Sequence, residues 1–246
     1  MSPETVVQVP APAALEVRNE NGWVPAVYWQ PQCAPRGIVL ACHGGSGHKT
    51  SAAILAAVVR LMPLGISVLA IDGPVHGERS EGSLDPVEAR HRFHQAWIAG
   101  TSNASMARDM RSALDALLQV PGHSRCPVGY LGVSMGTAYG LPLLAAEPRI
   151  QAAAIGLWSA RAEASSHLLS AALEVRCATW FTQQWNDEFF DREGTFELFD
   201  AIGAADKRLV VYPGSHLELQ NERLDDAVAF LAPRLLHHSG SSSLLN

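Results

Sequence analysis

Short, uninterrupted runs of apolar residues recur along the middle of the chain. They cover residues 36–42, 66–71, 128–133, 152–157 and 208–212. A strand that is buried on both faces has this pattern, whereas a strand with one wetted face alternates apolar and polar positions. The runs therefore predict the central strands of a parallel sheet.

Helix-like stretches separate these runs. They cover residues 51–61, 103–118, 136–146, 190–202 and 222–236. Alternation of strand and helix predicts an α/β fold, with a doubly wound, mostly parallel sheet flanked by helices on both faces. Before this region, residues 14–30 alternate imperfectly around Asn-Glu-Asn-Gly, a turn signal. We therefore also expect an N-terminal antiparallel hairpin.

Length and composition favour one compact domain. The 246 residues are 48% hydrophobic and 17% charged, which allows a sizeable core and excludes wholesale disorder. We expect a single domain over residues 1–238 and a flexible, low-complexity tail over residues 239–246.

Charge and cysteine usage narrow the possible partners and compartment. Eighteen basic and 24 acidic residues give a net charge of −6, and no window is rich in Lys or Arg, so nucleic acid is not expected as a partner. The apolar residues 52–71 are interrupted by Arg60, Pro63 and Gly65, which favours a buried helix and strand over a membrane span. The four cysteines lack C-x-x-C spacing, and the N-terminus lacks an export signal, so we expect reduced thiols and a cytoplasmic protein.

The pentapeptide Gly132-Val133-Ser134-Met135-Gly136 matches G-x-S-x-G, the nucleophile elbow. In this motif a sharp turn between a strand and a helix presents the serine Oγ above the sheet. The match lies between a predicted strand and a predicted helix, as the motif requires. An ordinary glycine-rich turn is the alternative interpretation.

An elbow serine needs a base, which in this topology comes after the acid along the chain. His167 comes before any strand that could carry the acid, and His237 and His238 lie near the C-terminus. His216 follows the last apolar run directly, in a loop that can place it over Ser134. His216 is therefore the candidate base, with a surface histidine as the alternative.

The acid is expected at a strand end between the serine and the histidine, where it can orient the imidazole. The strand-like run 177–183 is followed at once by Asp187. Glu188 and Asp191 are rivals, but we expect both to lie further into the next helix and to interact with its N-terminal dipole. Asp187 is therefore favoured.

Acyl transfer also needs hydrogen-bond donors for an oxyanion. The glycine-rich segment His43-Gly44-Gly45-Ser46-Gly47 follows a buried strand and can turn backbone N–H groups toward a substrate, with the N–H of Met135 as partner. The segment could instead bind a phosphate, but it lacks the Lys-Ser/Thr of a P-loop and the spacing of a dinucleotide site.

Several motifs together resemble the α/β-hydrolase superfamily, most closely its dienelactone-hydrolase-like esterase and peptidase branch. These are HGGSGH at 43–48, DGPVHGER at 72–79, GVSMG at 132–136, WND at 185–187 and YPGSH at 212–216. The resemblance implies Ser134 as nucleophile, Asp187 as acid, His216 as base, and Gly45 with Met135 as oxyanion-hole donors. It departs from dienelactone hydrolases proper, which use a cysteine nucleophile, so a lactone substrate is not implied.

His43, Asp72 and His76 have side chains that can bind a metal. Adjacent strand ends bring such residues together without a metal, and we favour hydrogen bonds that order the loops. We therefore expect neither a metal nor a cofactor.

Gly44, Trp158, Phe189 and Leu217 are candidate substrate-binding residues, although the three apolar ones could equally belong to the core. The long insertion 79–106 is a candidate roof over the site. The favoured function is a serine hydrolase acting on a small-molecule carboxylic ester. A thioesterase, a small-peptide hydrolase and a non-catalytic binding protein remain alternatives.

Overall fold

The computed structural model describes residues 9–80, 85–100 and 102–236. The predicted tail, residues 239–246, lies outside these ranges. Within them, no helix combines the length and the apolar content needed to cross a membrane.

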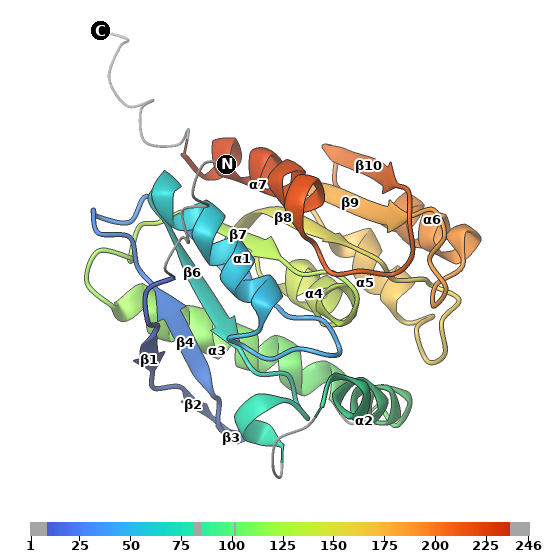
Figure 1. Cartoon of the computed structure of the whole chain (residues 1–246), viewed down its shortest axis with the longest axis horizontal. Helices are drawn as coiled ribbons and strands as arrows, with labels where there is room; N and C mark the ends of the chain where they lie inside the picture. Colours follow the sequence, from blue (N-terminus) through green and yellow to red (C-terminus); the bar gives the residue numbers. More distant parts are fainter. Residues whose placement is uncertain (1–8, 81–84, 101, 237–246) are drawn as a thin grey trace, which may run out of the picture.

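An eight-stranded sheet runs through the middle of the molecule (Figure 1). The two strands at one edge are antiparallel to their neighbours, and the other six are parallel to one another. In spatial order the strands are β1 (Ala13–Leu15), β4 (Ala26–Trp29), β6 (Ile66–Ile71), β5 (Gly37–Ala41), β7 (Val128–Leu131), β8 (Ile150–Gly156), β9 (Ala178–Gln184) and β10 (Lys207–Tyr212). The predicted doubly wound, mostly parallel sheet is confirmed.

The predicted N-terminal hairpin is also present. Strands β2 (Arg18–Asn19) and β3 (Gly22–Trp23) pair antiparallel around the Asn-Glu-Asn-Gly turn and form a separate small sheet. Gly22 has a φ of 104°, a backbone conformation that favours glycine.

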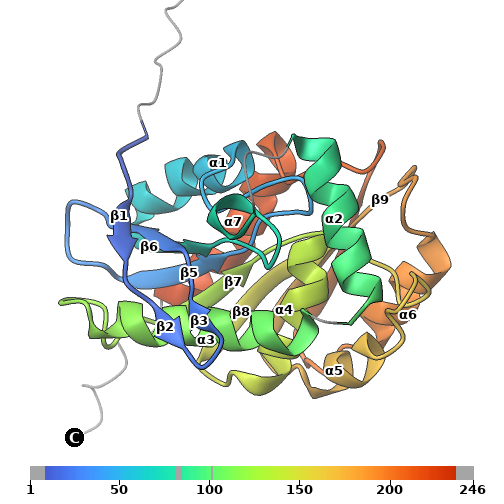
Figure 2. The ribbon, with the colours of Figure 1, turned by 90° about the horizontal axis from the view of Figure 1, so that it is seen from below.

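Helices cover both faces of the main sheet (Figures 1 and 2). Helices α1 and α7 pack on one face, and α3, α4, α5 and α6 on the other. Their bounds are α1 (Ala52–Leu61), α2 (Pro86–Ile98), α3 (Asn103–Gln119), α4 (Met135–Ala146), α5 (Leu168–Glu174), α6 (Arg192–Ala201) and α7 (Asn221–Leu236).

Strand β5 shows why the central strands appear as unbroken apolar runs. Ile38 and Leu40 enter the core under α3 and α4, whereas Val39 and Ala41 enter the core under α1 and α7. Both faces of the strand are buried, so neither needs polar residues. Because β5 lies between β6 and β7, the chain winds in both directions from it, and ligands of such sheets bind at the carboxyl ends of the strands at this point.

Helix α2 lies in the long insertion, where the sequence analysis assigned no element. Asp85 caps its N-terminus by accepting hydrogen bonds from the backbone N–H groups of Val87 and Glu88, and Pro86 occupies the first helical position. Phe93 and Trp97, one turn apart, are buried. Helix α2 therefore packs against the core, and it lies beside the end of the sheet that carries the candidate site (Figure 2).

Candidate active site

Ser134 occupies the turn between β7 and α4 in a strained conformation. Its φ is 57° and its ψ is −122°, a backbone conformation that residues other than glycine rarely adopt. The turn is tight on both sides. A Cβ on Gly132 would lie 3.1 Å from the Cβ of Cys42, and one on Gly136 would lie 3.0 Å from the carbonyl oxygen of Cys42. The two glycines of the motif are therefore needed where the elbow passes β5.

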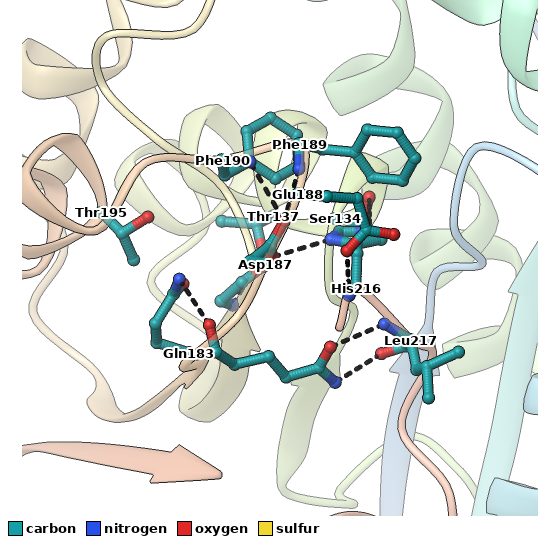
Figure 3. A network of polar contacts seen from close by, with 12 residues as sticks. Ser134, Thr137, Gln183, Asp187, Glu188, Phe189, Phe190, Thr195, His216 and Leu217 are labelled. Carbon is teal, nitrogen blue, oxygen red and sulfur yellow. Dashed lines mark hydrogen bonds and ion pairs between the residues drawn. The ribbon is translucent and has the colours of Figure 1, made fainter. Parts of the chain in front are cut away.

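His216 connects Ser134 with Asp187 (Figure 3). Its Nε2 lies 3.1 Å from the Oγ of Ser134, and its Nδ1 lies 2.8 Å from the Oδ2 of Asp187. The Asp187 side chain is fully buried and that of His216 is 14% exposed. Residues from three separate loops, far apart in the sequence, thus form one continuous hydrogen-bonded chain.

Both carboxylate oxygens of Asp187 take part in hydrogen bonds. Its Oδ1 accepts hydrogen bonds from the backbone N–H groups of Phe189 and Phe190, at 2.9 and 3.0 Å. Oδ2 is left for the imidazole. The carboxylate is thereby fixed as an acceptor toward Nδ1 of His216.

The two rival carboxylates have other contacts. Helix α6 begins at Arg192, later than predicted, so the expectation that Glu188 lies inside it was wrong. Glu188 instead accepts a hydrogen bond from the backbone N–H of His216 at 2.8 Å. Asp191 caps α6 by accepting from the backbone N–H of Gly194. Of the three acidic side chains, only that of Asp187 contacts the imidazole.

Gln184 is a residue that the sequence analysis did not identify. Its buried side-chain amide accepts from the backbone N–H of Leu217 at 2.7 Å and donates to the carbonyl of Leu217 at 2.9 Å. The amide at the end of β9 therefore pairs with the His216 loop as a neighbouring strand would. A glutamine at a strand end next to the acid was the only sequence signal for it.

The glycine-rich segment after β5 contacts both the elbow and α2. The backbone N–H groups of Gly45 and Met135 donate no hydrogen bond to any residue that the structure describes. Gly45 packs closely against Phe93, so that a Cβ added to Gly45 would lie only 3.0 Å from the Phe93 ring. His76 donates from Nε2 to the carbonyl of Gly45 at 2.9 Å, which fixes the orientation of this peptide.

His43 and His76 pack against each other as neutral rings. Burial is the largest cause and the nearby His76 the second cause of a lowered pKa of about 3 for His43. Burial also lowers the pKa of His76. The lone pair on Nε2 of His43 accepts from the backbone N–H of Gly73 at 3.0 Å, and Nδ1 donates to the carbonyl of Gly44. Both ring nitrogens of His43 therefore order the loops through hydrogen bonds.

Asp72 is paired with Lys49. The fully buried carboxylate lies 2.6 Å from Nζ of Lys49 and also accepts from the backbone N–H groups of Lys49 and Glu78. Across residues 9–80, 85–100 and 102–236, no group of three or more His, Cys, Asp or Glu side chains has an arrangement that could hold a metal ion.

We expect Lys49→Ala to lower the free energy of unfolding by about 3–5 kcal/mol, because it leaves the Asp72 carboxylate buried without its cation. Denaturant unfolding followed by circular dichroism measures the change. Arg60→Ala is the control, since Arg60 forms an exposed pair with Asp225 and should cost at most about 1 kcal/mol. Equal losses in the two variants would contradict the prediction.

A cavity of about 430 Å³ opens beside Ser134 and His216. One face of α2 forms part of its wall, through Arg90, Phe93, His94 and Trp97. The α2 part of the insertion thus borders the cavity. Of the candidate substrate-binding residues, Trp158, Phe189 and Leu217 line it. Gly44 is not among the lining residues and packs against the side chain of Glu218.

An aromatic wall, defined here as Phe93, Trp97, Trp158 and Phe190, forms one apolar side of the cavity. The ring centroids of Trp97 and Trp158 are 5.3 Å apart, and those of Trp158 and Phe190 are 4.6 Å apart. Both indole N–H groups donate to Ser165. The wall therefore presents ring surface, with no free N–H, to a ligand.

Known structures share this fold. A cold-adapted esterase from an Arctic intertidal metagenomic library, in complex with PEG, is 35% identical, with a TM-score of 0.79 over 91% of this chain and 93% of that chain. Dienelactone hydrolase from Anabaena variabilis is 23% identical, with a TM-score of 0.67 over 94% of this chain and 99% of that one. No family model and no curated protein matches the sequence.

The similarity to the Arctic esterase extends across nearly all of both chains, and the two share the same sheet and helix arrangement. Dienelactone hydrolase shows the same fold at lower identity. The chain therefore belongs to the α/β-hydrolase family and is an ester-hydrolysing enzyme.

Proposed function

We propose that this enzyme is a serine hydrolase that cleaves a carboxylic ester of a small molecule through a covalent acyl-enzyme. The observation that carries the proposal is the hydrogen-bonded chain from Ser134 through His216 to Asp187, with distances of 3.1 and 2.8 Å. A serine placed on a strained elbow and contacted by an oriented imidazole is the arrangement that nucleophilic catalysis requires.

In the acylation step, Nε2 of His216 removes the proton of Ser134 while Oγ attacks the ester carbonyl. The backbone N–H groups of Gly45 and Met135 stabilise the negative charge that develops on the carbonyl oxygen. The ester C–O bond then breaks, and His216 gives its proton to the departing alcohol. Ser134 is left carrying the acyl group.

In the deacylation step, His216 removes a proton from water, which attacks the acyl-enzyme. The acid is released, and the proton returns to Ser134. Asp187 remains ionised throughout and stabilises the imidazolium that forms in each step. Because its other oxygen is held by two backbone N–H groups, the imidazole keeps one orientation.

A fluorophosphonate probe with peptide mapping tests the nucleophile, and we expect one label, on Ser134. Matched p-nitrophenyl esters, thioesters and anilides then test the bond that is cleaved. The esterase relative supports the ester as the preferred substrate. Labelling at a residue other than Ser134, or turnover of the anilides alone, would overturn the proposal.

Gln184 is expected to act as a positioning residue for His216. Gln184→Met keeps the volume of the buried side chain but removes both hydrogen bonds to Leu217. A catalytic group displaced by about 1 Å can cost about 100-fold in rate, so we expect kcat to fall about 10- to 100-fold while KM changes little.

The matched control for this prediction is Gln220→Met, because Gln220 is exposed and lies in the same loop. It should keep the wild-type kcat. Steady-state kinetics and the rate of fluorophosphonate labelling both measure the effect. An unchanged kcat in Gln184→Met would show that the loop holds His216 without this amide.

A further inference from the structure

Glu218 lines the cavity together with Ser134 and His216, yet the proposed mechanism does not use it. It follows His216 by two residues, and its carboxyl group lies against the backbone of Gly44. A Cβ on Gly44 would overlap Oε1 of Glu218. The carboxyl therefore lies at the base of the segment whose next residue, Gly45, supplies the proposed oxyanion donor.

Glu218 differs in its partners from three other buried acidic residues. The carboxylates of Asp72, Asp109 and Glu147 pair with Lys49, Arg79 and Arg149 respectively. No Lys or Arg side chain among the described residues forms an ion pair with Glu218. Burial raises the pKa of its carboxyl group, and the nearby His216 and a hydrogen bond from the backbone of Gly44 oppose this shift. A buried carboxyl group without a paired cation is costly to ionise, and a cationic group of a ligand placed against it would stabilise the ionised form.

The rest of the cavity is also suited to a positive charge. Its lining includes three glutamates, Glu163, Glu188 and Glu218, one arginine, Arg90, and two histidines, His94 and His216. Glu163 lies 4.0 Å from Nε2 of His94, and Glu188 accepts from the backbone N–H of His216. The guanidinium of Arg90 lies over the ring of Phe189, 5.0 Å from its centroid. The aromatic wall adds ring faces, whose electrostatic potential attracts cations.

We propose that the site selects esters that carry a protonated amine within a few bonds of the scissile carbonyl, and that Glu218 binds this amine. The inference rests on the proposed function, because the position of the amine is set by the ester carbonyl at Ser134 and Gly45. The apolar remainder of the substrate packs against the aromatic wall. Esters of aromatic or aliphatic amino acids have this chemistry.

The test compares two esters that differ by the amine alone, phenylalanine ethyl ester and ethyl 3-phenylpropionate. An α-ammonium group activates an ester by itself, so the informative quantity is the change in the ratio of the two kcat/KM values between proteins. Charge-assisted hydrogen bonds correspond to about 10- to 100-fold in affinity. We expect Glu218→Gln to lower the ratio by about this factor, by slowing only the amino ester.

Glu222→Gln is the matched control, because Glu222 is an exposed glutamate on α7, outside the cavity lining. It should keep the wild-type ratio. If Glu218→Gln slows both esters equally, Glu218 shapes the Gly44 backbone and the inference is wrong. An unchanged ratio with Ser134-dependent turnover of both esters would also overturn it, while leaving the serine hydrolase proposal intact.

A binding experiment separates the two proposals, because it needs no turnover. With Ser134→Ala protein, calorimetry compares phenylalaninamide with 3-phenylpropionamide, which lacks the amine. We expect the amine compound to bind about tenfold more tightly or better, and Glu218→Gln in the same background to remove the difference. Equal affinities would contradict amine recognition, whether or not the esters are hydrolysed.

Discussion

Ser134→Ala is expected to lower kcat for every ester substrate by about 10⁴-fold or more, because no other group on the elbow can form the acyl-enzyme. The Oγ atom contacts His216, and its removal leaves the buried contacts of the surrounding glycines unchanged. The variant should therefore fold and keep its substrate affinity. Steady-state kinetics measures the loss.

Two further measurements make this result specific. Fluorophosphonate labelling should disappear in Ser134→Ala, and the thermal unfolding midpoint should stay within a few degrees of the wild-type value. The unchanged midpoint excludes loss of activity by unfolding. A Ser134→Ala protein that still hydrolyses esters at a rate near the wild-type rate would show that the nucleophile lies elsewhere.

Asp187→Asn is expected to lower kcat by about 10⁴-fold while the protein remains folded. The reason lies in the hydrogen bonds of the carboxylate. The backbone N–H groups of Phe189 and Phe190 require an acceptor, so the asparagine oxygen must take the place of Oδ1. The side-chain NH₂ then faces Nδ1 of His216 and donates a hydrogen bond to it. Nδ1 is therefore the unprotonated ring nitrogen and the ring proton lies on Nε2, so Nε2 cannot accept the proton of Ser134.

Asp191→Asn is the matched control, because Asp191 caps α6 and contacts Ser159 without touching the imidazole. Asparagine is also a good helix cap, so this variant should keep most of its activity and stability. If Asp191→Asn were inactive and Asp187→Asn active, the assignment of the acid would be wrong. The kinetic comparison needs folded protein in both cases, which circular dichroism verifies.

Helix α2, which borders the cavity, could not be predicted from the hydrophobic pattern alone. The face of α2 that points into the cavity mixes charged and aromatic residues, Arg90, Phe93, His94 and Trp97. Such a face gives a weak amphipathic signal, because part of it contacts a cavity and part of it contacts the core. The Asp-Pro pair at its N-terminus was the stronger local sign of a helix start.

Local sequence determined the sheet, the N-terminal hairpin and the positions of Ser134, His216 and Asp187 along the chain. These features depend on neighbouring residues: strands buried on both faces are continuously apolar, and an elbow is a turn directly between a strand and a helix. No long-range contact is needed to recognise them.

Tertiary structure alone decided the groups that surround them. The pairing of Gln184 with Leu217, the contact of Glu188 with the backbone of His216, and the position of Glu218 against Gly44 each join separate segments. Such contacts depend on how loops converge at the end of the sheet, and a single side chain carries no periodic signal for them. The sequence therefore determined where the candidate catalytic residues occur, and the packing of the loops determined which side chains contact them.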